Sequence, residues 1–314
     1  MKRFYSSSSQ RFLTQAAYDQ SMLYRNQVGY KQSAPRPPKR SHKLRYFVVL
    51  LLVAAFGAHI LWSKHVAAET LAAHQAEVQA AAEAQAKAKT ARAQIAGIVA
   101  ANPNDSFSVA IISSLDGLQI YGGSQAYDGA SVGKLLTATD FLHHVEQGSA
   151  SLQQQIDGQT AQYWLKIMII NSDDNAWNEL NSFLGNDDLN TYAQSLGLSN
   201  FDATANTFTT SDVAGLLQKL YDGRLVNSAN RSLLLSYLAQ ANYRDFIVTA
   251  VPSSDTVFHK IGLDGDEVND AAIITHGQKY LVMVIFSNGN GSYDWPARAN
   301  LMQAMTRDAM TAYL

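Results

Sequence analysis

The 314-residue sequence contains no cysteine. This absence excludes disulfides, iron–sulfur clusters, thiolate zinc sites and cysteine nucleophiles. The 24 Lys and Arg nearly balance the 26 Asp and Glu, so the basic excess of a nucleic-acid-binding domain is missing and we expect no nucleic-acid partner. The eight histidines show no HExxH or similar spacing, which predicts neither a metal site nor a cofactor. His143 and His144 are neighbours on an expected helix and face different directions, which favours a solvated pair.

Residues 1–45 form a basic, polar segment. They hold ten Lys and Arg against the single acid Asp19, with a serine run at 6–9 and a proline-rich stretch at 35–38. Such a composition buries too little apolar surface to offset the cost of ordering the backbone. We interpret this segment as a disordered cytoplasmic tail.

Residues 46–62 form an apolar run, which predicts a membrane-spanning helix over 46–63. Aromatic side chains stand at its two ends, as is typical of membrane interfaces. A cleaved signal peptide and a buried core helix are the alternatives, and the long leader argues against the first. Residues 31–45 carry six Lys and Arg, whereas the fifteen residues after Trp62 carry only Lys64. This asymmetry predicts a single-pass protein of the cell membrane, with the N-terminus cytoplasmic and the rest extracytoplasmic.

Residues 64–104 are rich in alanine, with interspersed Glu, Gln and Lys. Alanine is the best helix former, so we expect a helical stalk followed by a linker at Asn102-Pro103-Asn104.

The remaining residues, 105–314, are predicted to form one α/β domain of the α+β type. Apolar patterns indicate strands at 107–113, 118–122, 268–275 and 280–287, with a hairpin turn at Gly277. A mostly helical block lies between, and a closing helix is expected over 294–314. This order predicts an antiparallel sheet built from both ends of the domain and a helical subdomain built from its middle.

Ser131 and Lys134 form the first candidate for chemistry. Positions i and i+3 share a helix face, so the hydroxyl and the amine could come within hydrogen-bond reach. A serine needs a neighbouring base to become a good nucleophile, and a lysine is such a base only when its pKa is lowered. A helix N-terminus without catalysis is the alternative.

Two further segments carry candidate groups. Ser172-Asp173-Asp174 could relay a proton through its hydroxyl, or could merely cap a helix. Lys260-Ile261-Gly262 could place a positive charge beside a substrate carboxylate on an edge strand, or could be an exposed strand lysine.

Together and in this order, the three segments resemble the SxxK, SDN and K-[ST]-G motifs of class A β-lactamases and penicillin-binding proteins. Ser172–Asn178 resembles the longer SDN-x-A-x-N pattern of that family, and the strand after Lys260 also fits. The resemblance covers about residues 105–314.

The resemblance implies a serine hydrolase in which Ser131 attacks a carbonyl and Lys134 activates it. Ser172 would pass the proton onward, and Lys260 would support that relay and bind the substrate carboxylate. It also implies that the substrate is bound at Asp174, Gly262 and Leu263. The backbone N–H groups of Ser131 and Leu263 would form an oxyanion hole.

The sequence departs from the family pattern at three places. Ile261 replaces the usual Thr or Ser, which removes a hydroxyl for the substrate carboxylate. Asp174 replaces Asn and would repel an anionic ligand unless it is protonated or paired. The loop 197–211 lacks the Glu that activates water for deacylation; Asp202 is its only acid, although the loop-tethering Asn178 is retained. Slow or absent hydrolysis of a penicillin acyl-enzyme is the consequence.

Three hypotheses remain open from the sequence. The first is an active serine acyl hydrolase or DD-peptidase on peptidoglycan-like substrates, the second is a true β-lactamase acting on β-lactam-like substrates, and the third is a non-catalytic binding module. In each case the membrane partner is contacted through residues 46–63.

Overall fold

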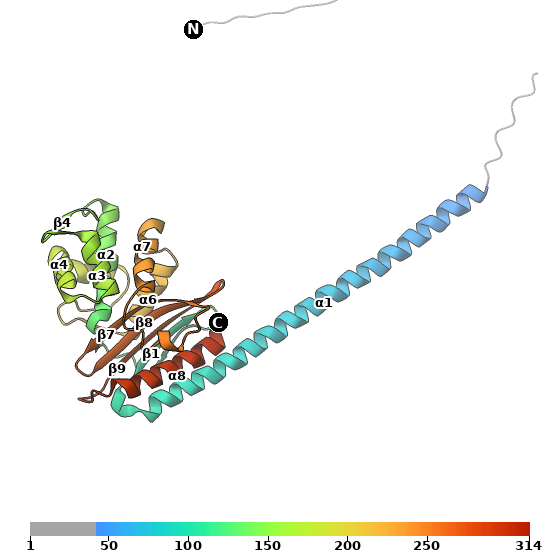
Figure 1. Ribbon diagram of the computed structural model, residues 1–314. Coiled ribbons are helices and arrows are strands. Elements are labelled where there is room, and N and C mark those ends of the chain that lie inside the picture. Colours follow the sequence, from blue (N-terminus) through green and yellow to red (C-terminus); the bar gives the residue numbers. More distant parts are fainter. Residues whose placement is uncertain (1–41) are drawn as a thin grey trace, which may run out of the picture. The chain divides into compact units, whose positions relative to one another are not determined.

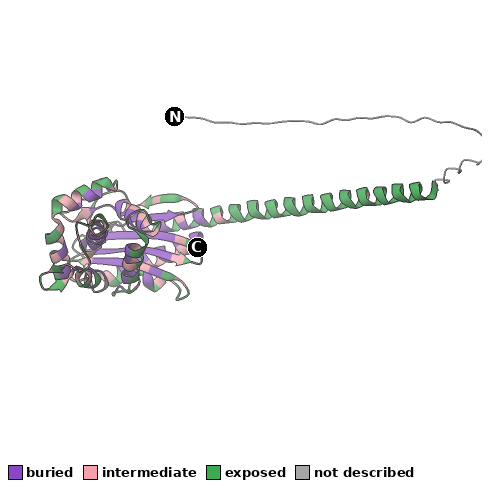
Figure 2. Ribbon diagram, turned by 90° about the horizontal axis from the view of Figure 1, so that it is seen from above, coloured by how far each residue is buried: buried purple, intermediate pink, exposed green. Residues whose placement is uncertain are grey.

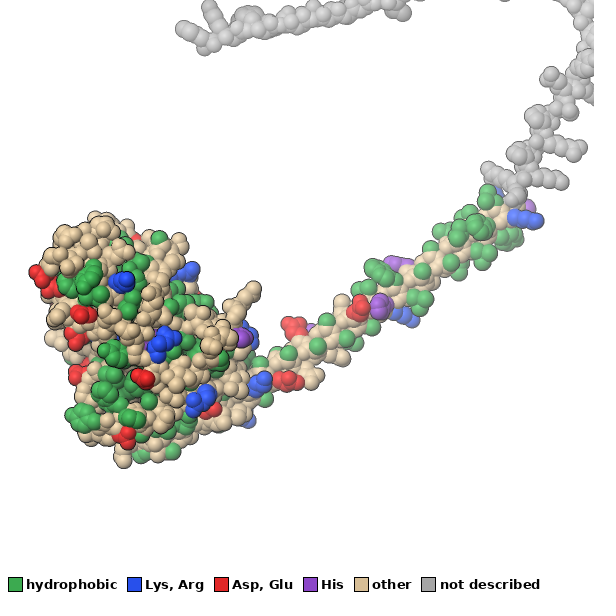
Figure 3. Space-filling model, viewed as in Figure 1, with side chains coloured by type: hydrophobic (Ala, Val, Ile, Leu, Met, Phe, Trp, Pro, Cys, Tyr) green, Lys and Arg blue, Asp and Glu red, His purple; other side chains and the backbone are tan. Residues whose placement is uncertain are grey.

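The computed structural model describes residues 42–314, so the expected tail lies outside the described residues except for 42–45, which are helical. The first element, α1 (His42–Ala101), is one continuous helix over the expected membrane segment and stalk. The chain divides into two compact units after Ala68, and each is described by itself. Hydrophobic side chains gather along the first part of α1, and this helix is long and apolar enough to cross a membrane (Figure 3).

An antiparallel five-stranded sheet organises residues 69–314, in the order β2-β1-β9-β8-β7. Its strands come from both ends of the domain, as predicted: β1 (Ser108–Ser113), β2 (Gly117–Tyr121), β7 (Thr256–Asp264), β8 (Glu267–His276) and β9 (Lys279–Asn288). The sequence analysis placed Lys260 on an edge strand, and β7 is an edge of this sheet. The other strands pair in two-stranded ribbons: β3 (Tyr127–Asp128) with β6 (Thr207–Phe208), and β4 (Gln155–Ile156) with β5 (Gln159–Thr160).

The helical subdomain covers one face of the sheet, as Figure 1 shows. Its main helices are α2 (Lys134–Gln147), α3 (Ala161–Ile170), α4 (Asp174–Leu184), α5 (Asn186–Ser195), α6 (Thr210–Tyr221) and α7 (Ser228–Ala239). Short 3-10 turns complete the connections: η1 (Pro103–Asp105), η2 (Ala130–Gly133) and η3 (Val248–Ala250). Leu135, Phe141 and Leu165 belong to the buried cluster that joins these helices to the sheet.

The opposite face of the sheet packs against α8 (Trp295–Tyr313) and the end of α1 (Figure 1). Ala88, Ala91 and Ile95 of α1 are buried in this second cluster, in which the small alanines allow close approach to the neighbouring elements. The packed body therefore begins well before residue 105, the expected start of the domain. Figure 2 shows buried residues along the strands and exposed residues along the earlier part of α1.

Candidate active site

Ser131 lies in η2, the turn that leads directly into α2. The preceding residue, Ala130, has φ of +46°, a left-handed conformation that side chains other than glycine seldom adopt. Asp128 accepts a hydrogen bond from the Ala130 N–H at 2.8 Å, and the Asn206 amide donates to the Ala130 carbonyl at 3.0 Å and to the Asp128 carboxylate at 3.1 Å. These contacts hold a strained turn that presents the Ser131 hydroxyl, a pattern typical of functional sites.

Lys134 is completely buried and its ammonium contacts three oxygens. The Nζ atom donates to Ser131 Oγ at 2.6 Å, to the Ser172 carbonyl at 3.0 Å and to Asp174 Oδ1 at 2.5 Å. It also lies 4.8 Å from the centre of the Trp177 ring. Burial lowers the pKa of Lys134, and the Asp174 carboxylate opposes that shift. Asp174 is therefore paired with Lys134, but its side chain is 79% exposed at the cleft, so the carboxylate still faces an incoming anionic ligand.

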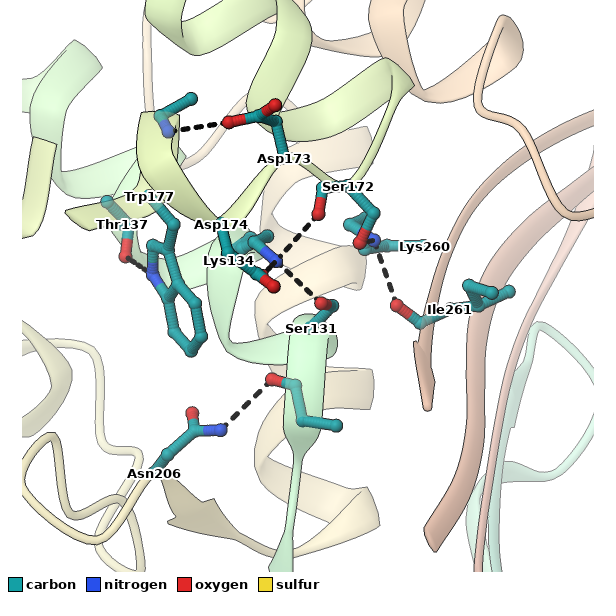
Figure 4. A network of polar contacts seen from close by, with 12 residues as sticks. Ser131, Lys134, Thr137, Ser172, Asp173, Asp174, Trp177, Asn206, Lys260 and Ile261 are labelled. Carbon is teal, nitrogen blue, oxygen red and sulfur yellow. Dashed lines mark hydrogen bonds and ion pairs between the residues drawn. The ribbon is translucent and has the colours of Figure 1, made fainter. Parts of the chain in front are cut away.

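Ser172 and Lys260 form the second half of the network (Figure 4). The Lys260 Nζ lies 2.8 Å from Ser172 Oγ and 2.9 Å from the Ile261 carbonyl. Ser172 has φ of +59°, and the next residue, Asp173, caps α4 by accepting from the Ala176 N–H at 2.8 Å. Within the Ser172-Asp173-Asp174 segment, Asp173 is thus the residue that caps a helix, while Ser172 faces the lysines.

The pKa of Lys260 is lowered to about 7. Burial of the side chain, which is 1 % exposed, is the largest cause, and the charge of Lys134 adds to it. An amine with this pKa is substantially neutral near pH 7 and can accept a proton there.

Strand β7 approaches the nucleophile closely through Gly262. A Cβ atom at this position would lie 2.3 Å from the Gly129 carbonyl oxygen and 3.1 Å from the Ser131 nitrogen. Only glycine fits such a contact, so the sequence requirement for Gly262 has a steric cause. Ile261 is 4 % exposed and packs mainly in the cluster under α8.

A cleft of about 230 Å³ brings the predicted groups together; its lining includes Ser131, Asn171, Ser172, Asp174, Tyr243, Ile261 and Leu263. Lys134 and Lys260 reach its serines from below the surface. Tyr243 and Leu263 also line a groove of about 560 Å³ that includes Phe246, Trp295 and Gln303. The two cavities therefore lie beside the same two side chains.

The loop acid Asp202 is committed to its own loop. Its Oδ1 atom accepts from the Thr204 N–H at 2.8 Å and from the Ala205 N–H at 3.1 Å, and its backbone pairs with Thr207. Asn178 is exposed on α4. The residue of this loop that reaches the Ser131 turn is Asn206.

Sequence reasoning found the two serines and two lysines of the network but missed Asp128, Asn206 and Tyr243. Asp128 and Asn206 are 78 residues apart and meet only in the folded chain. Tyr243 stands between α7 and β7 with φ of +61°, outside any motif.

Comparison with known proteins agrees with this geometry. The model of the beta-lactamase enzyme family matches residues 90–313, more than half of the chain, so the protein belongs to this family of β-lactamase- and transpeptidase-like serine hydrolases. The match also begins before residue 105. It includes Ala91 and Ile95, which are packed against the sheet. The comparison with curated proteins gave no match.

Solved structures share the fold at low identity. PBP-A is 22% identical with a TM-score of 0.66, covering 71% of this chain and 96% of its own. A β-lactamase from Sphaerobacter thermophilus is 22% identical with a TM-score of 0.65, covering 70% and 96%. A β-lactamase from Burkholderia phymatum is 21% identical with a TM-score of 0.66, covering 73% and 100%. A mutant of PBP-A forms an acyl-enzyme complex with penicillin G.

Proposed function

We propose that this protein is a membrane-anchored, extracytoplasmic serine acyl hydrolase that forms an acyl-enzyme at Ser131 on cell-wall peptides or related amides and esters. The observation that carries the proposal is the continuous network in which Lys134 contacts Ser131 and Lys260 contacts Ser172. A larger groove that shares Tyr243 and Leu263 with the cleft would suit an extended, peptide-like acyl substrate better than a compact one.

Membrane anchoring is supported by α1. Leu50, Leu52 and Phe56 are exposed on its first part, where a bilayer would cover them. The basic residues of 31–45 favour a cytoplasmic N-terminus, which places the hydrolase domain outside the cytoplasm. The helical residues between the membrane segment and residue 88 would serve as the stalk of that domain.

The hydrogen-bond partners of the two lysines support different roles for them. Lys134 donates to three oxygens, which uses all three protons of an ammonium and leaves no lone pair for Ser131. Lys260 has two oxygen partners, so as a neutral amine it can donate to the Ile261 carbonyl and accept from Ser172. Lys260 is therefore the proton acceptor, and Lys134 stabilises the Ser131 oxygen as its negative charge develops.

The acylation step then runs as a relay. Ser131 Oγ bonds to the substrate carbonyl carbon and gives its proton to Ser172 Oγ, which passes its own proton to Lys260 Nζ. The tetrahedral oxyanion is held by the Ser131 and Leu263 N–H groups. Collapse expels the leaving group, which takes the proton back from Lys260 through Ser172, and leaves the acyl group on Ser131.

Deacylation is expected to be slow for penicillins. Two N–H groups of its own loop hold Asp202 through Oδ1, and among the described residues no side-chain contact joins Asp202 to the Ser131 turn, so we do not expect this acid to activate a water at Ser131. A penicillin would therefore remain attached rather than turn over, which favours a peptidase-like or esterase-like activity over true β-lactamase activity.

Active-site labelling tests the proposal. The full chain in detergent would be incubated with a fluorophosphonate and, separately, with fluorescent penicillin, and adducts would be located by peptide mass spectrometry. We expect labelling at Ser131 that is lost in Ser131→Ala and kept in Ser124→Ala, a matched change at an exposed serine. If a folded chain forms no adduct with either probe, the remaining hypothesis is a non-catalytic binding module. If the chain turns over nitrocefin rapidly and Ser131→Ala does not, the protein is a β-lactamase.

A further inference from the structure

The far half of α2 carries a second polar cluster, separate from the Ser131 network. Asp140 and His144 share one face of α2, and Asp188 stands in the first turn of α5. His144 Nε2 lies 2.6 Å from Asp188 Oδ2 and 3.7 Å from Asp140 Oδ1. One ligand-type atom from each of the three residues lies within 4.8 Å of the others. His144 is ten residues beyond Lys134, about 15 Å along the helix.

Ser149 contacts the other ring nitrogen of His144. Its oxygen lies 2.8 Å from His144 Nδ1 and 3.1 Å from the His144 carbonyl oxygen. When the hydroxyl donates to the carbonyl, its oxygen accepts from Nδ1–H and the Nε2 lone pair faces the two carboxylates, which is the tautomer that a metal ion needs. When the hydroxyl donates to Nδ1 instead, Nε2 carries the ring proton and donates it to Asp188. Nε2 therefore holds either a proton or a metal ion.

Asp140 distinguishes between these two species. Its side chain is 1 % exposed, and its Oδ2 atom is buried with no hydrogen-bond partner in the described part of the chain. A proton on Nε2 satisfies Asp188 at 2.6 Å but leaves this Asp140 oxygen unpaired, which is costly in a buried site. A metal ion between the three residues satisfies both carboxylates at once.

We propose that Asp140, His144 and Asp188 bind a divalent transition-metal ion, of which Zn²⁺ is the best candidate. One imidazole and two carboxylates form a donor set that Zn²⁺ accepts, with water in the remaining position. The Nδ1–H contact to Ser149 is the outer-shell hydrogen bond that orients metal-binding histidines. An open cavity lined by Gly185, Asn186 and Asp188 gives the ion and its water an entry path.

The bound ion would link α2 to α5 and so brace the helix that begins beside Ser131. The sequence analysis expected no metal site because Asp188 follows His144 by 44 residues, which no local spacing reveals. The expectation that His143 and His144 are a solvated pair was wrong. His143 packs against Tyr192 with ring centres 5.2 Å apart, and the side chain of His144 is only 24% exposed.

Zinc binding to the full chain, without a histidine tag and stripped with EDTA, tests the proposal independently of Ser131 chemistry. Equilibrium dialysis with metal analysis should give one Zn²⁺ per chain, and Zn²⁺ should raise Tm. Cobalt loading should give the visible absorption bands of a four-coordinate site. His144→Ala should abolish all three signals, Ser149→Ala should weaken zinc binding about tenfold, and His143→Ala, the matched control, should change none of them.

Two results would overturn the metal assignment. One is a folded wild-type chain that takes up no zinc, which would make the cluster a hydrogen-bonded pair of His144 and Asp188 beside Asp140. The other is zinc uptake that persists in His144→Ala, which would place the ion elsewhere. Neither result bears on the labelling of Ser131, so the failure of one proposal is distinguishable from that of the other.

Discussion

The two ends of α2 carry polar clusters of opposite composition. At the N-terminal end Lys134 pairs with Asp174, while the second lysine, Lys260, contacts only a hydroxyl and a carbonyl oxygen. At the other end two carboxylates lie near the imidazole of His144. Burial lowers the pKa of Lys260, the charge of Lys134 adds to that shift, and the amine becomes a base. The surplus of carboxylates at the other end favours a bound cation instead. The comparison indicates that burial and the balance of charges together decide what each cluster can do.

Removal of the Lys260 amine should give the largest effect. Lys260→Met deletes the proton acceptor, and we expect acylation of Ser131 to slow about 10³-fold. Lys260→Arg, which keeps the charge but cannot release a proton at neutral pH, should be similarly slow. The measurement is the rate of adduct formation by intact mass spectrometry. Lys166→Met, a matched change at an exposed lysine of α3, should react like wild type; a fast Lys260→Arg variant would mean that charge alone suffices.

Gly262→Ala should give the next largest decrease in the rate of Ser131 acylation. The added Cβ would lie 2.3 Å from the Gly129 carbonyl, so β7 must move away from the Ser131 turn. A displacement of that order costs about 10²-fold in acylation rate, which the same mass assay measures. Gly215→Ala on α6 has no atom within 4 Å of its added Cβ and serves as the control. Unchanged acylation in Gly262→Ala would show that the approach of β7 does not position the site.

Asp174→Asn should have a smaller effect, and the size of that effect should depend on the charge of the probe. Loss of the carboxylate removes repulsion of anionic acyl donors, so acylation by penicillin should quicken about tenfold at low salt and less at high salt. A neutral ester should gain much less. The comparison of penicillin and ester rates at two salt concentrations checks this. Equal gains for both probes would place the effect in Lys134 rather than in substrate attraction.

The sequence predicted the sheet and the four groups of the network because both leave local signals. The strand segments at 107–113 and 280–287 are short, continuous apolar runs, which suit strands that are buried on both faces, and the spacing from Ser131 to Lys134 puts both on one helix face. The start of the packed domain was not predictable, because Ile95 lies in an Ala-rich run that reads as a uniform helix. The pairing of Asp128 with Asn206 and that of His144 with Asp188 depend on tertiary contacts over 40 or more residues.

The pH dependence of Ser131 acylation tests the relay most directly. The free amine of Lys260 is the base, so the rate with a neutral ester should rise about tenfold per pH unit below the Lys260 pKa of about 7 and level off above it. In Lys260→Met this limb should disappear. A wild-type rate that does not change between pH 5 and 9, or the same limb in Lys260→Met, would contradict Lys260 as the proton acceptor.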